Sequence, residues 1–138
     1  MKKIILIALV LMLVACSAGG VQSDRQKWED ANIANYRFQL TLSCFCPFRD
    51  QMPLTIEVRD GKVASMMYAD GQAVASDDIN YEFFLQYGTM DDIFAKIEGA
   101  QADPEAGEVI VTYDPTYGFP VDASIDYIKL AIDDEMVL

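Results

Sequence analysis

Cys44 and Cys46 are separated by one residue, and this spacing lets the two thiols form a disulfide or bind one metal ion. Outside the cytoplasm, two thiols this close are expected to be oxidised or bound to a metal. In a regular strand, residues i and i+2 hold their Cα atoms near the upper limit for a disulfide, about 7 Å, so a bridge requires a bend, for which Pro47 marks a suitable place. The pair can be a local structural disulfide, which is the interpretation we favour, a thiol redox couple, or a thiolate site for Cu(I) or zinc.

The rest of the sequence offers few partners for such a metal. A tetrahedral zinc site needs four ligands, and the chain has no histidine and only one further cysteine. Met66 and Met67 could donate thioether sulfur to Cu(I), but a methionine pair in an apolar strand is more typical of a core. The absence of histidine also excludes Ser-His-Asp triads and Cys-His dyads. We expect a protein that is not an enzyme and that has no cofactor.

Acidic side chains occur in clusters, which in other proteins hold Ca²⁺ or act as paired catalytic carboxylates. The spacing of an EF-hand loop is absent. We expect solvated structural roles for most of these acids, and we take Asp133, Asp134 and Glu135 as weak candidates for a metal site. The other acidic residues of this kind are Asp77, Asp78, Asp91, Asp92, Asp122 and Asp126.

Residues 113–120, with the sequence YDPTYGFP, combine aromatic side chains with two prolines and a glycine. Exposed tyrosine and phenylalanine side chains make good contact anchors. Tyr113, Asp114, Tyr117 and Phe119 are therefore candidates for a recognition loop. The alternative, which we favour, is a hairpin connection whose aromatic residues cover the end of a sheet.

The N-terminus predicts an export signal rather than a membrane span. Lys2 and Lys3 precede an apolar run over residues 4–14, which is shorter than the roughly 20 residues that a spanning helix needs. The run ends in Leu-Val-Ala-Cys, which resembles a bacterial lipobox, a signal that is removed before a cysteine that becomes lipidated, here Cys16. We expect a signal peptide over residues 1–15, the lipidated cysteine and a flexible tether over 16–23, and one globular domain over 24–138.

A lipid-modified N-terminus places the domain at a membrane surface, because two or three acyl chains together anchor a protein stably. We expect a membrane-anchored lipoprotein of the cell envelope, facing the periplasm from the outer membrane if the cell is Gram-negative. Removal of residues 1–15 changes the formal net charge from −12 to −14. Such an acidic domain is expected to avoid nucleic acid and anionic lipid away from its anchor.

Capping residues and apolar spacing predict two helices. Ser23 is a suitable cap for a helix over residues 24–35. Thr89 and Asp92 resemble a capping box at the start of a clearer helix that ends near residue 102. Residues 70–88 match neither period well and predict a loop with a short ordered piece.

Alternating apolar and polar residues predict the strands. Residues 36–46, 54–59 and 121–127 alternate, residues 108–113 form an apolar run typical of an interior strand, and residues 135–138 can form a last short strand. We expect an α+β fold in which an antiparallel sheet of about five to six strands carries two helices on one face, in the order α-β-β-β-α-β-β(-β).

Asp60 and Gly61 form a two-residue hairpin signal between the second and third strands. If Arg59 pairs with Lys62, the apolar faces of the two strands coincide. The predicted register pairs Val58 with Val63, Ile56 with Ser65 and Leu54 with Met67.

Taken together, Cys-x-Cys-Pro at residues 44–47, the hairpin VRDGKV at 58–63, YDPTYGFP at 113–120 and the Asp-Asp-Glu run at 133–135 carry a resemblance. The chain is similar, from about residue 28 onward, to an uncharacterised family of small bacterial lipoproteins that shares Cys-x-Cys-Pro, YDPxYGxP and Asp-Asp-Glu motifs. The resemblance implies a cell-envelope lipoprotein domain and implies no activity, substrate or catalytic residue.

We expect the chain to act as a lipid-anchored binding or accessory protein with an unknown protein partner in the envelope. One alternative is a thiol redox or Cu(I)-binding protein that uses Cys44 and Cys46. Another is an inhibitor-like module that presents residues 113–120 to an extracellular enzyme.

Overall fold

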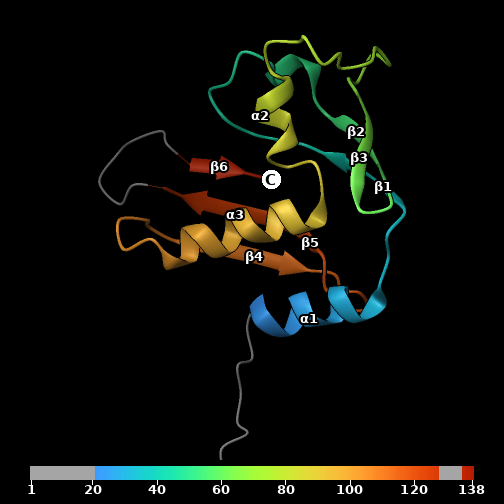
Figure 1. Ribbon diagram of the computed structural model, residues 1–138. Coiled ribbons are helices and arrows are strands. Elements are labelled where there is room, and N and C mark those ends of the chain that lie inside the picture. Colours follow the sequence, from blue (N-terminus) through green and yellow to red (C-terminus); the bar gives the residue numbers. More distant parts are fainter. Residues whose placement is uncertain (1–20, 128–134) are drawn as a thin grey trace, which may run out of the picture.

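The computed structural model describes residues 21–127 and 135–138, which form an α+β fold (Figure 1). The predicted signal peptide, the lipidation site Cys16 and two of the acidic candidates, Asp133 and Asp134, lie outside the described residues. The elements in chain order are α1 (Val21–Ala31), β1 (Tyr36–Leu40), the 3-10 helix η1 (Arg49–Gln51), β2 (Leu54–Arg59), β3 (Lys62–Met67), α2 (Tyr81–Leu85), α3 (Met90–Ala102), β4 (Val109–Tyr113), β5 (Pro120–Asp126) and β6 (Glu135–Val137).

The strands form two antiparallel sheets of three strands each, in the orders β1-β2-β3 and β4-β5-β6. The prediction of one sheet of five to six strands was therefore wrong, although the α+β class is confirmed. The strand predicted over residues 36–46 ends at Leu40, and beyond it Ser43 bridges the other sheet by pairing with Val137. Among the described residues, this bridge is the one backbone pairing between the two sheets, which diverge along β1 and the start of β5 (Figure 1).

The β2–β3 hairpin forms at the predicted turn. Asp60 and Gly61 both have positive φ angles, 50° and 71°, which suit the tight turn of a two-residue hairpin. The predicted pairs Arg59–Lys62 and Val58–Val63 are confirmed, but a β-bulge follows and shifts the register. Beyond the bulge, Ile56 pairs with Met66 and Thr55 with Met67, in place of the predicted pairs Ile56–Ser65 and Leu54–Met67. The bulge turns Met66 into the core, where its side chain is 3% exposed.

Helix α1 runs from Val21 to Ala31, so each of its ends lies about one turn earlier in the chain than in the predicted helix over 24–35. Asn32 follows with φ of 48°, and an asparagine in the left-handed conformation is a common helix terminator. The capping box at the start of α3 is confirmed, because the Thr89 side chain accepts from the Asp92 N–H while the Asp92 carboxylate accepts from the Thr89 N–H. The short ordered piece expected within residues 70–88 is α2.

In the second sheet, α3 lies across β4 and β5 (Figure 1). Phe94 of α3 stacks on Tyr113 of β4, with ring centroids 6.1 Å apart. The run predicted as an interior strand, β4, is an edge strand of the described sheet, and its Ile110 side chain is 54% exposed. The predicted last short strand is confirmed as β6.

One apolar core joins the two sheets and the helices. On the first sheet, Phe84 of α2 packs edge-on against Phe48 and Tyr68. Trp28 of α1 makes edge contacts with Tyr36 and Phe119 and closes the opposite end of the core. No helix among the described residues is both long and apolar enough to cross a membrane. The largest fully buried side chains are Phe84, Phe94, Leu42, Leu54, Ile56, Ile97, Ile125 and Val58.

Candidate binding groove

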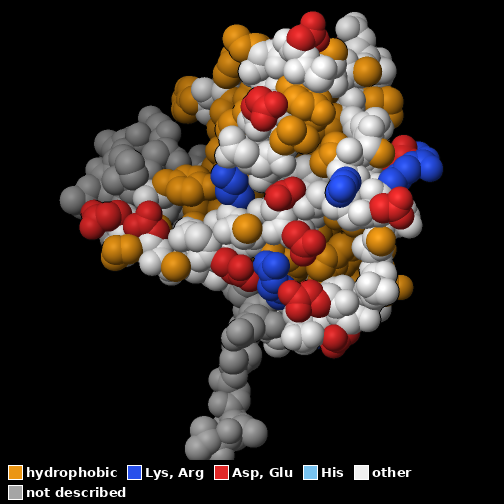
Figure 2. All heavy atoms as spheres, viewed as in Figure 1, with side chains coloured by type: hydrophobic (Ala, Val, Ile, Leu, Met, Phe, Trp, Pro, Cys, Tyr) orange, Lys and Arg blue, Asp and Glu red, His pale blue; other side chains and the backbone are white. Residues whose placement is uncertain are grey.

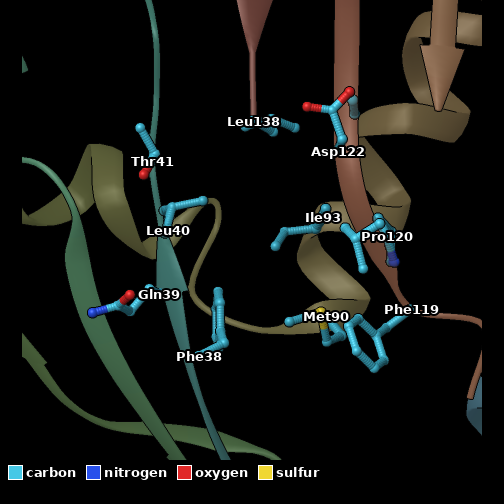
Figure 3. Close-up of a pocket in the computed structure, with 12 residues that line it drawn as sticks. Phe38, Gln39, Leu40, Thr41, Met90, Ile93, Phe119, Pro120, Asp122 and Leu138 are labelled. Atoms are coloured by element: carbon cyan, nitrogen blue, oxygen red, sulfur yellow. The ribbon is translucent and has the colours of Figure 1, made fainter. Parts of the chain in front are cut away.

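A groove of about 230 Å³ lies where the two sheets separate, between β1 and the first half of β5 (Figure 3). Figure 3 shows Leu40 of β1 and Ile93 of α3 pointing toward one another across this opening. The groove is smaller than the pockets of roughly 300–1,000 Å³ that usually enclose drug-sized ligands. It is lined by Phe38, Gln39, Leu40, Thr41, Met90, Ile93, Phe119, Pro120, Val121, Asp122, Ala123 and Leu138.

The first turn of α3 forms the apolar floor of the groove. Met90 and Ile93 face it, and both side chains are largely buried, at 6% and 4% exposed. The capping box at Thr89 holds the start of this helix in place. The Tyr36 hydroxyl of β1 accepts a hydrogen bond of 3.0 Å from the Met90 N–H, one of the first-turn donors that lack a partner within a helix. The floor is therefore fixed to the strand that forms one wall.

Each wall of the groove is a strand with one open side. β1 pairs with β2 on one side, and no described strand pairs with residues 37–41 on the other side. β5 pairs with β4 throughout, but β6 covers only its second half, and the last pair before the groove is Leu138 with Ala123. Val121, next to the groove, falls at a β-bulge between the pairs Tyr113–Pro120 and Thr112–Asp122.

Polar side chains stand at the rim. Gln39 of β1 and Thr41, directly after β1, are exposed, and Asp122 is exposed on β5, where Figure 3 shows it next to Leu138. Arg37 is also exposed and forms an ion pair of 3.7 Å with Glu57. Among the described residues, no basic side chain pairs with Asp122. Within the part of the chain that the structure describes, the rim therefore offers one carboxylate without a basic partner, beside an apolar floor.

Cys44 and Cys46 lie in a bend after β1, with their sulfur atoms at bonding distance and their Cα atoms 5.2 Å apart. The bend agrees with the geometric requirement for bridging residues two positions apart. Phe45 between them is 88% exposed, whereas both cysteines pack against the core. Met66, one of the two methionines for which a core position was favoured over copper binding, is a buried core residue.

The acidic candidates are dispersed rather than gathered. Asp92 belongs to the capping box, and Asp91 lies 3.9 Å from Arg25. Asp77 is exposed, and Glu135 begins β6. Among residues 21–127 and 135–138, no group of three cysteine or acidic side chains is placed to hold a metal ion. Figure 2 shows the acidic side chains scattered over the face that carries α1 and α3, among fewer basic ones.

Asp78 lies beside a second, polar hollow of about 540 Å³, lined in part by Asp50, Asp70 and Tyr68. The Asn80 N–H and the Tyr68 hydroxyl donate to Asp78, at 2.8 and 2.7 Å, and these bonds lower the pKa of its carboxyl below the usual value. Burial and the contact with Asp78 raise the pKa of Tyr68 to about 12. Both oxygens of the Asp78 carboxylate therefore have hydrogen-bond donors from the protein itself, and the position of this side chain is explained without a ligand.

The loop over residues 113–120 turns most of its aromatic side chains inward. Tyr113 stacks on Phe94, and Phe119 contacts Trp28. Asp114 accepts from the N–H groups of Thr116 and Tyr117 and so stabilises the turn. Tyr117, at 46% exposed, is the aromatic residue that the loop presents most to solvent.

The groove is not predictable from the sequence pattern. Its residues come from four separate segments of the chain, and each segment carries an ordinary strand or helix pattern. One signal was present: residues 36–46 alternate as a strand beyond the point where pairing with β2 stops.

These features define a class of protein: a small α+β domain with two antiparallel sheets and an apolar groove between them. Residues 20–138 match the profile of a family of unknown function, DUF6174, and the chain belongs to this family. No curated protein and no solved structure matches it. The expected resemblance to an uncharacterised family is confirmed at this level, while its lipoprotein character and shared motifs stay predictions.

Proposed function

We propose that the chain is a lipid-anchored, non-enzymatic binding domain of the cell envelope, and that the groove between β1 and β5 is its binding site. The observation that carries this proposal is the groove itself, which combines an apolar floor, two strands with open sides and a free carboxylate at the rim. Such a combination suits a macromolecular partner that supplies both apolar side chains and hydrogen bonds.

The lipid anchor is supported by the sequence. A short apolar run after two lysines ends in Leu-Val-Ala-Cys, and Cys16 is the proposed attachment site. An anchored domain meets partners at the same membrane at a raised effective concentration. The small groove is therefore compatible with a functional interaction of modest intrinsic affinity.

The anchor is tested by labelling cells with radioactive palmitate. The wild-type chain should incorporate the label, and the Cys16→Ser variant should not. Label in the variant, or an intact leader in mass spectra of the wild-type protein, would contradict the anchor.

The binding site is tested by site-specific photocrosslinking in intact cells. A photoreactive amino acid at Thr41, on the rim, should give a discrete crosslinked product. The same amino acid at Glu105, an exposed residue beyond the opposite end of α3, is the matched control. Equal crosslinking from both positions, or none from Thr41, would refute the groove as the site.

A second candidate is a thiol redox function of Cys44 and Cys46, and the strongly exposed Phe45 between them favours it, because a reductant can reach this bend. Thiol titration of the purified chain before and after treatment with glutathione tests this function. A redox function requires two additional thiols to appear after the treatment, and their absence would exclude this function.

A further inference from the structure

We infer that the groove takes an extended segment of a partner protein as an added β-strand between β1 and β5. This inference specifies the partner of the binding site proposed above and therefore rests on that proposal. It starts from the way in which β6 sits between the two sheets.

β6 already occupies the position that the added strand would continue. The backbone of Val137 exchanges two hydrogen bonds with Ser43, of 2.9 and 3.3 Å, while Val137 also pairs with Ser124 of β5. One strand thus fills the space between the extension of β1 and β5 at this level. After Leu138, which bonds to Ala123 through both backbone groups, the same two walls continue along the groove.

The open strand edges make an extended peptide the fitting occupant. A strand presents the N–H and C=O groups of every second residue on each side, and neighbouring strands lie roughly 4.8 Å apart. Residues 37–40 of β1, continued by Thr41, and the residues Val121 and Asp122 of β5 each have such a side without a described partner strand, while Pro120 has no N–H to offer. A strand antiparallel to both would use both sets of groups, whereas a compact apolar ligand would leave them unpaired.

The two faces of the groove define the sequence of the added strand. Phe38, Leu40, Met90 and Ile93 form the inner face, and Gln39, Thr41 and Asp122 stand at the rim. Because side chains of a strand alternate between faces, the partner segment has apolar residues at every second position. A lysine or arginine at an outward position would pair with Asp122.

The test places such a segment in the groove by extending the chain after Leu138. Leu138 pairs with Ala123, whose side chain faces the core, so the first added residue points outward beside Asp122. The in-phase extension is Lys-Val-Thr-Val-Thr-Val. The phase-inverted extension, Val-Lys-Val-Thr-Val-Thr, has the same composition and directs its polar side chains at the apolar floor.

The in-phase extension should raise the melting temperature by about 5 °C over the phase-inverted one, since two or more valines become buried. It should also abolish crosslinking from Thr41 in cells, because the groove is filled. Equal melting temperatures for the two extensions would overturn the inference.

The crosslinking result separates the two proposals. Crosslinking from Thr41 that survives the in-phase extension would overturn the strand while the binding site stands. No crosslinking from Thr41 in the unextended chain would overturn the binding site itself.

Discussion

Two tyrosine hydroxyls lie near α3, and removing one should stabilise the protein while removing the other should destabilise it. The Tyr113 hydroxyl is buried, and it makes no hydrogen bond to any described residue. Burial raises the pKa of Tyr113 to about 12, and the nearby charges of Asp24 and Glu98 add to the effect. The Tyr36 hydroxyl, in contrast, accepts a bond of 3.0 Å from the Met90 N–H.

The expected magnitudes follow from the cost of burying a polar group. An unpaired buried hydroxyl costs about 1–3 kcal/mol, and because Tyr113 is only half-buried as a residue, we expect Tyr113→Phe to stabilise the protein by about 1 kcal/mol. Tyr36→Phe leaves the Met90 N–H without its acceptor and should destabilise by about 1–2 kcal/mol. For a domain of this size, about 1 kcal/mol corresponds to roughly 3–6 °C in the melting temperature.

Urea unfolding measures both free energies, provided that the dependence on denaturant stays the same between variants. The two substitutions remove the same atom, so each is the control for the other. A loss of stability in Tyr113→Phe equal to that in Tyr36→Phe would refute the assignment of the unpaired hydroxyl and, with it, the packing of residues 113–120 against α3.

Three further predictions concern stability. Gly118→Ala should destabilise the protein by more than about 1 kcal/mol, because Gly118 has φ of 77° and an added Cβ would meet the carbonyl oxygen of Asp24. Gly71→Ala is the matched control, since Gly71 has φ of 86° but open space around it, and it should cost less stability in the same urea titration. Thr89→Ala should lose about 1 kcal/mol in thermal unfolding and Thr89→Ser much less, and equal losses would contradict the capping box. Burial raises the pKa of Tyr68, Tyr87 and Tyr113 to about 12, so the stability that their neutral forms provide is complete below pH 10 and is lost as the pH rises from 10 to 12. A titration followed by absorbance should show that these tyrosines ionise at a higher pH than exposed ones. Full ionisation of all tyrosines near pH 10 in the folded protein would contradict their burial.

Local features were predictable from the sequence because local chemistry determines them. The hairpin turn follows from the ease with which Asp60 and Gly61 adopt positive φ angles, and the capping box follows from the spacing of Thr89 and Asp92. The bend at the cysteine pair follows from the reach of a disulfide.

Features that depend on distant parts of the chain were not predictable in the same way. The bulge in the β2–β3 hairpin depends on burial of Met66 in the common core, which the alternation of β3 alone does not indicate. The division into two sheets depends on where β1 leaves β2, and Leu40 and Leu42 are both buried on either side of that point. The groove is a consequence of this division, so no single motif could reveal it.

Amide hydrogen exchange in the chain with the in-phase extension tests the strand-binding groove most directly. Every second backbone amide over residues 37–41 should exchange more slowly than in the phase-inverted extension, because those amides gain a strand partner. Unchanged exchange along β1, with protection confined to other parts of the chain, would contradict the groove as a site for an added strand.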